Sequence, residues 1–114
     1  MNTSTRMVGD VAVIALSGKL MGGPDADAAR DIIKEALEKG TAKILMDVGG
    51  ISWVNSTGLG ILIASHVTVT NAGGQLKLCR VNNRIKQLFM VTQLLSVFET
   101  FDSEEEALKS FTAA

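Results

Sequence analysis

The segment with the clearest chemical potential is a run of small and polar residues, Asn55-Ser56-Thr57-Gly58-Leu59-Gly60. Asn55 or Ser56 can cap a helix, because either side chain accepts a hydrogen bond from the first unpaired N–H groups. A hydroxyl at such a position suggests an anion site, or a phosphoacceptor whose added charge the helix dipole tolerates. A purely structural cap with tight packing is the alternative, and the spacing alone favours it.

The first turn of this expected helix contains two glycines, which indicates a special requirement at this position. Gly58 and Gly60 each cost roughly 1 kcal/mol of helix stability relative to alanine. We therefore expect a neighbouring strand or a ligand to approach the backbone closely there.

The other residues that could do chemistry are isolated in the sequence. Trp53 is the only tryptophan, and it is expected in a loop as a core-edge aromatic or as a partner contact. His66 is expected on a helix surface or half-buried, and Cys79 in a buried strand. One cysteine and one histidine form neither a disulfide nor a structural zinc site. The sequence shows no catalytic nucleophile paired with a general base, so we expect no enzyme, no metal and no cofactor.

The net charge of −1 hides an uneven distribution of charged residues. Residues 1–47 carry six basic and seven acidic side chains, and residues 99–114 carry five acids and one lysine. Between them, residues 48–98 have no carboxylate and four cations, namely Lys77, Arg80, Arg84 and Lys86. Burial of much of this stretch is the simpler explanation, and the four cations are expected on a solvated face. The alternative is an anion or an acidic partner bound against it.

Length and composition define the class of protein. A chain of 114 residues, 46% hydrophobic and 20% charged, predicts a single globular domain over residues 1–114. Near-neutral charge argues against nucleic-acid binding. The longest apolar run is too short to cross a bilayer, and a secretory signal is not evident. We expect an intracellular, cytoplasmic protein that does not insert into membranes.

The first half of the chain predicts a hairpin, a helix and a buried strand. Gly9-Asp10 is a turn signal between two short strands within Val8–Leu16. After the break at Gly22-Gly23, a helix is expected to begin at Pro24 and to end at Lys39-Gly40. A buried strand over Lys43–Val48 is then expected to end at Gly49-Gly50.

The second half predicts two more strands and two more helices. A strand is expected at Leu76–Cys79, followed by a helix that Asn82 or Asn83 caps. A last strand is expected at Val97–Phe101, and Asp102-Ser103 open a final helix at capping-box spacing. The apolar residues expected to face the core from the two helices are Ile85, Leu88, Phe89, Ala107, Leu108 and Phe111.

The segment from Ser56 to Ala72 fits either a helix or a hairpin. Its β-branched residues and the alternation of Val67-Thr68-Val69-Thr70 favour strands. A shared apolar face and Gly73 as a C-cap favour a helix. Seventeen residues without an internal turn signal are too many for one strand, so we predict a helix. The fold is then α/β, in the order β-β-α-β-α-β-α-β-α, with a mixed sheet of four to five strands.

The segment from Asp47 to Gly60, Asp-Val-Gly-Gly-Ile-Ser-Trp-Val-Asn-Ser-Thr-Gly-Leu-Gly, resembles the signature of STAS domains, the family of bacterial anti-sigma factor antagonists. Ser17-Gly18-Lys19-Leu20 is similar to the turn that precedes the family's first helix. Gly73-Gly74-Gln75-Leu76 is similar to the turn before its next strand, and Arg84–Leu88 to a later helix. The resemblance covers nearly the whole chain.

The resemblance implies a phosphorylation switch at Ser56. In phosphorylatable members, an anti-sigma factor serine kinase modifies the serine directly after the motif's aspartate. The unmodified domain binds that kinase and frees the sigma factor, phosphorylation cancels the binding, and a serine phosphatase would reverse it. Thr57 is the second candidate for modification. The expected partner-binding residues are Trp53, Asn55, Ser56, Thr57, Gly58 and Leu59.

This chain departs from the family pattern at two places. Asn55 stands where the motif has aspartate, so the cap remains but its charge is absent. Lys19, Met21 and Gly22 stand where acidic residues are common. The alternative function is therefore a constitutive STAS scaffold, or a module for a small ligand, that is never phosphorylated.

Overall fold

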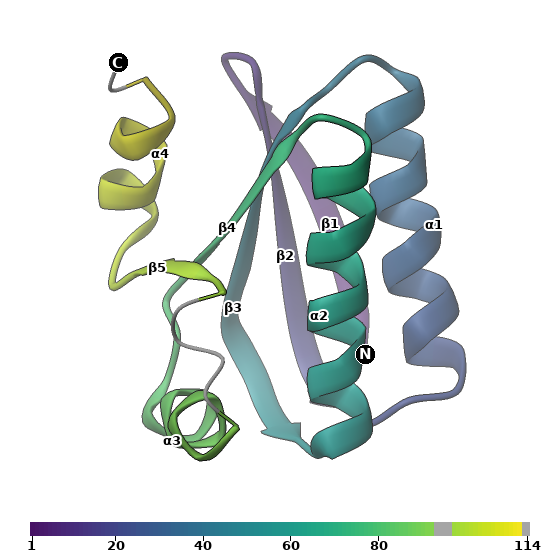
Figure 1. Ribbon diagram of the computed structural model, residues 1–114, viewed down its shortest axis with the longest axis vertical. Helices are drawn as coiled ribbons and strands as arrows, with labels where there is room; N and C mark the ends of the chain where they lie inside the picture. Colours follow the sequence, from purple (N-terminus) through teal and green to yellow (C-terminus); the bar gives the residue numbers. More distant parts are fainter. Residues whose placement is uncertain (93–96, 113–114) are drawn as a thin grey trace.

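The fold is a five-stranded sheet with helices on both faces, as seen in the computed structural model (Figure 1). The structure describes residues 1–92 and 97–112. The elements are β1 (Asn2–Val8), β2 (Val11–Leu20), α1 (Pro24–Glu38), β3 (Lys43–Val54), α2 (Ser56–Asn71), β4 (Gln75–Cys79), α3 (Asn83–Val91), β5 (Glu99–Phe101) and α4 (Glu104–Thr112). The sheet order is β1-β2-β3-β4-β5, with β1 antiparallel to β2 and the other pairs parallel. The predicted α/β class and element order are confirmed.

The two faces of the sheet hold separate apolar clusters. One cluster lies under α1, α2 and α3, and includes Ile14, Met46 and Phe89. The smaller one lies under α4, and includes Val13, Leu45 and Phe111. Figure 1 shows α1 and α2 side by side on one side of the sheet and α4 on the other. Side chains that alternate along β2 and β3 therefore serve both layers.

The hairpin turn at Gly9-Asp10 is confirmed, although both strands are longer than expected. Gly9 has a φ of 61°, which favours glycine, and Val8 pairs with Val11 across the turn. β2 continues to Leu20, so the segment Ser17–Leu20 lies in a strand rather than in the turn that the family resemblance implied.

The prediction that Gly49-Gly50 ends the third strand is wrong. β3 continues through both glycines to Val54 and stays paired with β2 across two register shifts. The two glycines allow neighbouring segments to approach the strand closely and do not form a turn. A Cβ on Gly49 would lie 2.8 Å from the Arg80 guanidinium carbon, and a Cβ on Gly50 would lie 2.9 Å from the Ser17 Cβ. The strand therefore carries Trp53, which we had expected in a loop.

The helix predicted between Ser56 and Ala72 is confirmed as α2. It ends where Gly73 adopts a φ of 82°, and the Gly74 N–H donates to the Val69 carbonyl oxygen at 2.9 Å. This pair of features closes the helix in the way predicted for a glycine C-cap.

The C-terminal third agrees with prediction apart from the length of β5. The Asn82 side chain caps α3, accepting a hydrogen bond from the Ile85 N–H at 2.9 Å. The final strand begins at Glu99 rather than Val97, because Phe98 turns into the core and stacks on Phe89 with ring centroids 5.2 Å apart. In the part of the chain described here, no helix has the length and apolar character needed to cross a membrane.

One predicted surface cation is buried. The Lys77 ammonium lies 4.6 Å from the centre of the Phe111 ring, 2.9 Å from the Ser110 hydroxyl oxygen and 3.1 Å from a Glu99 carboxylate oxygen. The contacts with α4 and β5 compensate the burial of its charge. Lys77 is therefore not part of a solvated face.

Candidate phosphorylation and partner-binding site

The junction of β3 and α2 places the motif residues at the start of a helix. Asn55 has extended backbone angles, and its side-chain oxygen accepts a hydrogen bond from the Gly58 N–H at 2.8 Å. Its own carbonyl oxygen accepts the Leu59 N–H at 2.8 Å. Of the two caps that the sequence left open, the structure selects Asn55. Ser56 is then the first residue of α2.

Ser56 and Thr57 are both exposed in the first turn of α2. The first turn carries no acidic residue, and its free N–H groups make it the positive end of the helix dipole. A negative group added to either hydroxyl would therefore meet a favourable field. The Thr57 methyl carbon faces the turn before α1, where a Cβ added to Gly22 would lie 2.7 Å from it.

The first glycine of the motif is explained by the neighbouring strand. A Cβ added to Gly58 would lie 1.9 Å from the Leu20 carbonyl oxygen at the end of β2. Gly58 and Leu59 are buried, so they shape the exposed surface from beneath. A Cβ on Gly60 would meet no other atom within 4 Å. The close approach of a neighbouring strand is therefore confirmed at Gly58, whereas at Gly60 no strand approaches and a ligand remains the open alternative.

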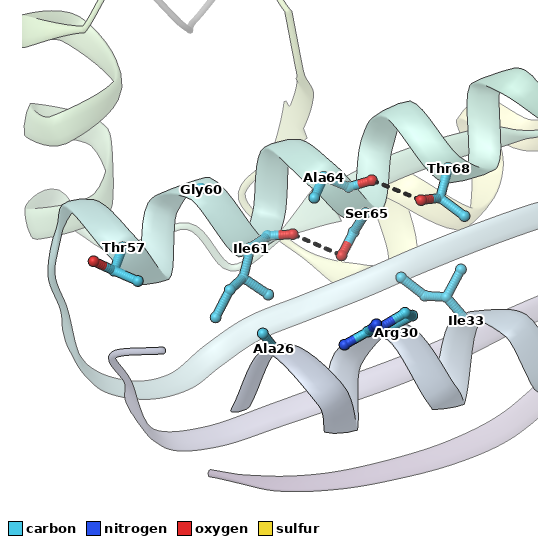
Figure 2. A pocket seen from close by; sticks show the side chains of 9 residues that line it. All are labelled: Ala26, Arg30, Ile33, Thr57, Gly60, Ile61, Ala64, Ser65 and Thr68. Atoms are coloured by element: carbon cyan, nitrogen blue, oxygen red, sulfur yellow. Dashed lines mark hydrogen bonds between the residues drawn. The ribbon is translucent and has the colours of Figure 1, made fainter. Parts of the chain in front are cut away.

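Gly60 instead borders a groove between α1 and α2, with a volume of about 330 Å³ (Figure 2). Thr57 lies towards one end of it, and Arg30 reaches in from α1. The Ser65 hydroxyl faces the groove, but it already donates to the Ile61 carbonyl oxygen at 2.8 Å. The residues that line the groove are Ala26, Arg30, Ile33, Thr57, Gly60, Ile61, Ala64, Ser65 and Thr68. The lining is mostly apolar and forms a groove beside the start of α2. It places no general base next to a hydroxyl group.

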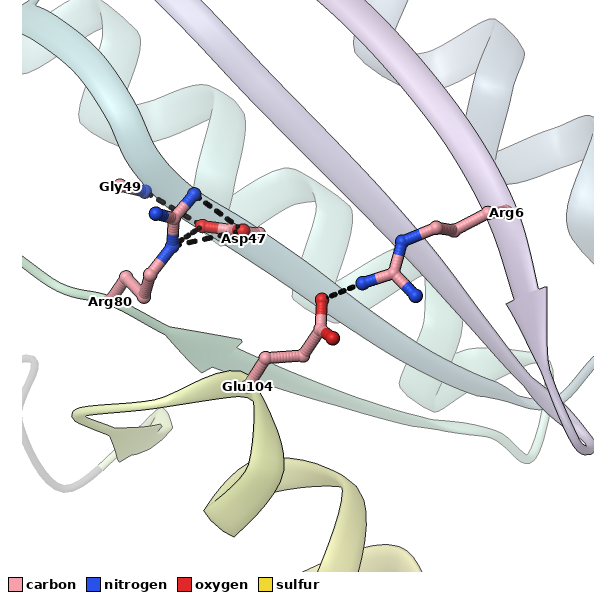
Figure 3. Close-up of polar contacts among 5 residues, drawn as sticks. All are labelled: Arg6, Asp47, Gly49, Arg80 and Glu104. Carbon is pink, nitrogen blue, oxygen red and sulfur yellow. Dashed lines mark hydrogen bonds and ion pairs between the residues drawn. The ribbon is translucent and has the colours of Figure 1, made fainter.

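The acid at the middle of β3 has a structural partner. Asp47 accepts two hydrogen bonds from the Arg80 Nε at 2.8 and 3.0 Å and one from the Arg80 Nη2 at 2.8 Å (Figure 3). The Gly49 N–H also donates to it at 3.0 Å. The hydrogen bonds that Arg80 donates to the Asp47 carboxylate raise the pKa of the Arg80 guanidinium above its ordinary value. Arg6 and Glu104 form a second ion pair on this face of the sheet.

Trp53 lies on β3 two residues before the cap, and its side chain is 41% exposed. The Arg84 guanidinium carbon lies 3.5 Å from the centre of its ring. His66 is half-buried with its ring edge-on to Phe98, and Cys79 is buried, as predicted.

Sequence reasoning missed that Arg84, Lys19 and Met21 lie beside Trp53. Lys19 and Trp53 are partners in the register of β2 and β3. The sequence signal that could have found this pair is parallel pairing of two strands that each end just before a helix.

The chain belongs to the STAS domain family, whose model matches residues 2–107. It is 23% identical over 105 residues to BtrV of Bordetella bronchiseptica, a candidate anti-sigma factor antagonist, covering 92% of this chain and 90% of that protein. Among solved structures, a candidate anti-sigma factor antagonist of Thermotoga maritima superposes with a TM-score of 0.87 at 20% identity, covering 97% and 95% of the two chains.

The anti-sigma factor antagonist SpoIIAA of Bacillus has been solved in two forms that share this fold. The unphosphorylated form matches with a TM-score of 0.76 at 21% identity, covering 99% of this chain and all of SpoIIAA. The phosphorylated form matches with a TM-score of 0.74 at 21% identity, covering 96% and 99%. Both forms are therefore compatible with the architecture described above.

Proposed function

We propose that this STAS domain is an anti-sigma factor antagonist that binds a kinase-type anti-sigma factor through the surface around Ser56. Phosphorylation of Ser56 by that kinase ends the binding, and a serine phosphatase restores it. The domain acts in the cytoplasm, where sigma factors work, and is itself no enzyme. The observation that carries the proposal is an exposed serine in the first turn of α2, directly after a capping residue.

The partner kinase catalyses the phosphoryl transfer. The Ser56 Oγ attacks the γ-phosphorus of ATP, the new O–P bond replaces the bond to ADP, and the hydroxyl proton passes to a base on the kinase. The product gains up to about two negative charges at pH 7. Because the start of α2 tolerates that charge, we expect repulsion and bulk to act on the interface and not on the fold.

Intact-mass analysis tests the proposed site. The chain is incubated with ATP and the kinase-type anti-sigma factor encoded nearest to it in its genome. We expect one phosphate on the wild type, one on Thr57→Val and none on Ser56→Ala. An unmodified wild type, or an equal gain on Ser56→Ala, would contradict Ser56 as the site.

The second candidate function is a constitutive scaffold or a small-ligand module that is not phosphorylated. Asn55 favours it, because the cap is kept while the family's charge is absent. The two functions differ in how they respond to a mimic of the phosphate. Binding of the anti-sigma factor that falls at least tenfold in Ser56→Asp supports the switch, and unchanged binding supports the constitutive function.

A further inference from the structure

Three segments far apart in the sequence form one exposed patch beside the start of α2. We call Lys19, Met21, Trp53 and Arg84 the cationic–aromatic patch. Lys19 lies on β2, Met21 in the turn after it, Trp53 on β3 and Arg84 in the first turn of α3. Lys19, Met21, Ser52 and Trp53 line a shallow hollow of about 370 Å³. Figure 1 shows the end of β3, the start of α2 and α3 at the same end of the molecule.

The stacking of Arg84 on Trp53 prepares the guanidinium to receive an anion. The ring covers one face of the guanidinium, with the guanidinium carbon 3.5 Å from the ring centre. The N–H donors lie in the guanidinium plane and remain at its edge. None of the hydrogen bonds among residues 1–92 and 97–112 uses these donors. The stacked geometry therefore lowers the entropy lost when a carboxylate binds at the edge.

Among the described residues, no acidic side chain forms an ion pair with either cation of the patch, Lys19 or Arg84. Asp25 is already engaged, because it accepts the Met21 N–H at 3.0 Å and pairs with the N-terminal amine at 3.4 Å. The apolar part of the patch is exposed as well, at 41% for Trp53 and 45% for Met21. Exposed tryptophan and arginine side by side are typical of the energetic centre of a protein interface.

We propose that the cationic–aromatic patch receives an acidic segment of the partner protein, with carboxylates on Lys19 and Arg84 and an apolar side chain against Trp53 and Met21. This inference rests on the proposed function and adds the chemistry of the partner's contact surface. It also explains the direction of the switch. A phosphate on Ser56, three residues after Trp53, adds negative charge beside the patch and repels the same carboxylates.

An acidic protein segment fits the patch better than a nucleic acid does. The chain has a net charge of −1, and the patch places two cations, Lys19 and Arg84, beside one aromatic ring. Nucleic-acid sites draw most of their affinity from many cations along the phosphate backbone. Binding of a single-stranded oligonucleotide is therefore an alternative outcome in the test below.

Trp53 is the only tryptophan, so its fluorescence reports directly on the patch. The probes are a soluble peptide in which glutamates flank one leucine, its counterpart with lysines in place of the glutamates, and an oligothymidylate. We expect a saturable change with the acidic peptide, with a Kd of about 1 mM or tighter, that weakens as salt rises. Lys19→Glu/Arg84→Glu abolishes the change, whereas the matched reversal Lys34→Glu/Lys109→Glu on α1 and α4 retains it.

Three results would overturn the inference: no response to the acidic peptide, an equal response to the basic peptide, or tighter binding of the oligothymidylate.

A second arm measures binding of the anti-sigma factor used above. Loss of at least tenfold in affinity in Lys19→Glu/Arg84→Glu, but not in the matched reversal, supports the patch as the contact surface. Undiminished affinity in Lys19→Glu/Arg84→Glu overturns it. Failure of the wild type to bind the anti-sigma factor counts against the proposed function alone, because the peptide arm still decides the chemistry of the patch.

Discussion

Arg80 joins β4 to β3 through the carboxylate of Asp47, whose side chain is only 10% exposed. Without the guanidinium, the carboxylate would keep the Gly49 N–H as its hydrogen-bond donor and lose three bonds. Because the Arg80 side chain itself is 56% exposed, we expect Arg80→Ala to lower the free energy of unfolding by only about 2 kcal/mol. Urea denaturation measures this value. Arginine and alanine share the cost of the positive φ of 53° at this position, so the difference reports on the side chain.

The matched control for Arg80→Ala is Lys109→Ala. Lys109 pairs with Glu105 on α4, with both side chains largely exposed. Its loss should cost less than about 0.5 kcal/mol. Equal costs for the two variants would show that the Asp47–Arg80 pair contributes no more than an ordinary surface pair.

The Cys79 thiol should be inert in the folded protein. Burial, followed by the nearby charge of Asp47, raises its pKa from 9.0 to about 12. At pH 8 the thiol therefore stays protonated and enclosed between the sheet and α4. We expect a colorimetric disulfide reagent to modify Cys79 only as fast as the protein unfolds, and immediately in denaturant. Modification of the folded protein at the rate of free cysteine would contradict this.

At the scale of the elements, Gly58 and Gly60 provide a matched test of how α2 sits on the sheet. A methyl group on Gly58 would collide with the Leu20 carbonyl oxygen, whereas one on Gly60 meets open space. We expect Gly58→Ala to lose about 3 kcal/mol of unfolding free energy, because the helix must move away from β2. Gly60→Ala should gain up to about 1 kcal/mol through helix propensity. Similar effects of the two substitutions in urea denaturation would disprove the close contact.

The cap of α2 gives a second prediction at this scale. Asn55→Ala removes the bond to the Gly58 N–H and should cost about 1 kcal/mol. Asn55→Asp keeps an acceptor and adds a charge that the helix dipole favours, so its thermal unfolding midpoint should equal or exceed that of the wild type. A drop in Asn55→Asp as large as in Asn55→Ala would mean that the side-chain bond is not what holds the helix start.

The elements themselves were largely predictable, because caps and apolar spacing are local signals. Asn82, Gly9 and Pro24 mark their turns and helix ends in any context. The failures come from residues whose role depends on distant neighbours. Gly49 and Gly50 have the composition of a turn, but they accommodate Arg80, just after β4, and Ser17 of β2. Sequence spacing cannot distinguish a glycine that bends the chain from one that lets another segment approach.

The same reasoning applies to the candidate site. The sequence placed the helix start at Asn55 or Ser56 but left the cap open between the two, and the structure selects Asn55. The stacking of Arg84 on Trp53 and the burial of Lys77 could not be predicted, because they require the packing of α3 and α4 against the sheet. The linear sequence did contain one related signal, a stretch of 51 residues without a carboxylate, but it does not show which of the cations in that stretch are buried.

For the whole molecule, two acidic side chains at turns contribute to the response to low pH. The hydrogen bond from the Met21 N–H lowers the pKa of Asp25 below its ordinary value of 3.8, and Lys43 lowers that of Asp10. A carboxyl whose pKa is lower in the folded state stabilises the fold above its unfolded pKa. That contribution is lost as the pH falls through the folded pKa. The molecule should therefore lose unfolding free energy from about pH 4 downwards.

The double variant Asp10→Asn/Asp25→Asn tests this dependence through urea denaturation at a series of pH values. At neutral pH the variant should be less stable than the wild type, because the carboxylates that Met21 and Lys43 favour are absent. The two stability curves should converge as the pH falls through the lowered pKa values of the wild-type carboxyls, because these groups then become protonated. Curves that stay parallel over the whole range would show that these two turns do not contribute to the acid response. The buried core beneath the helices would then remain the main determinant of stability at every pH.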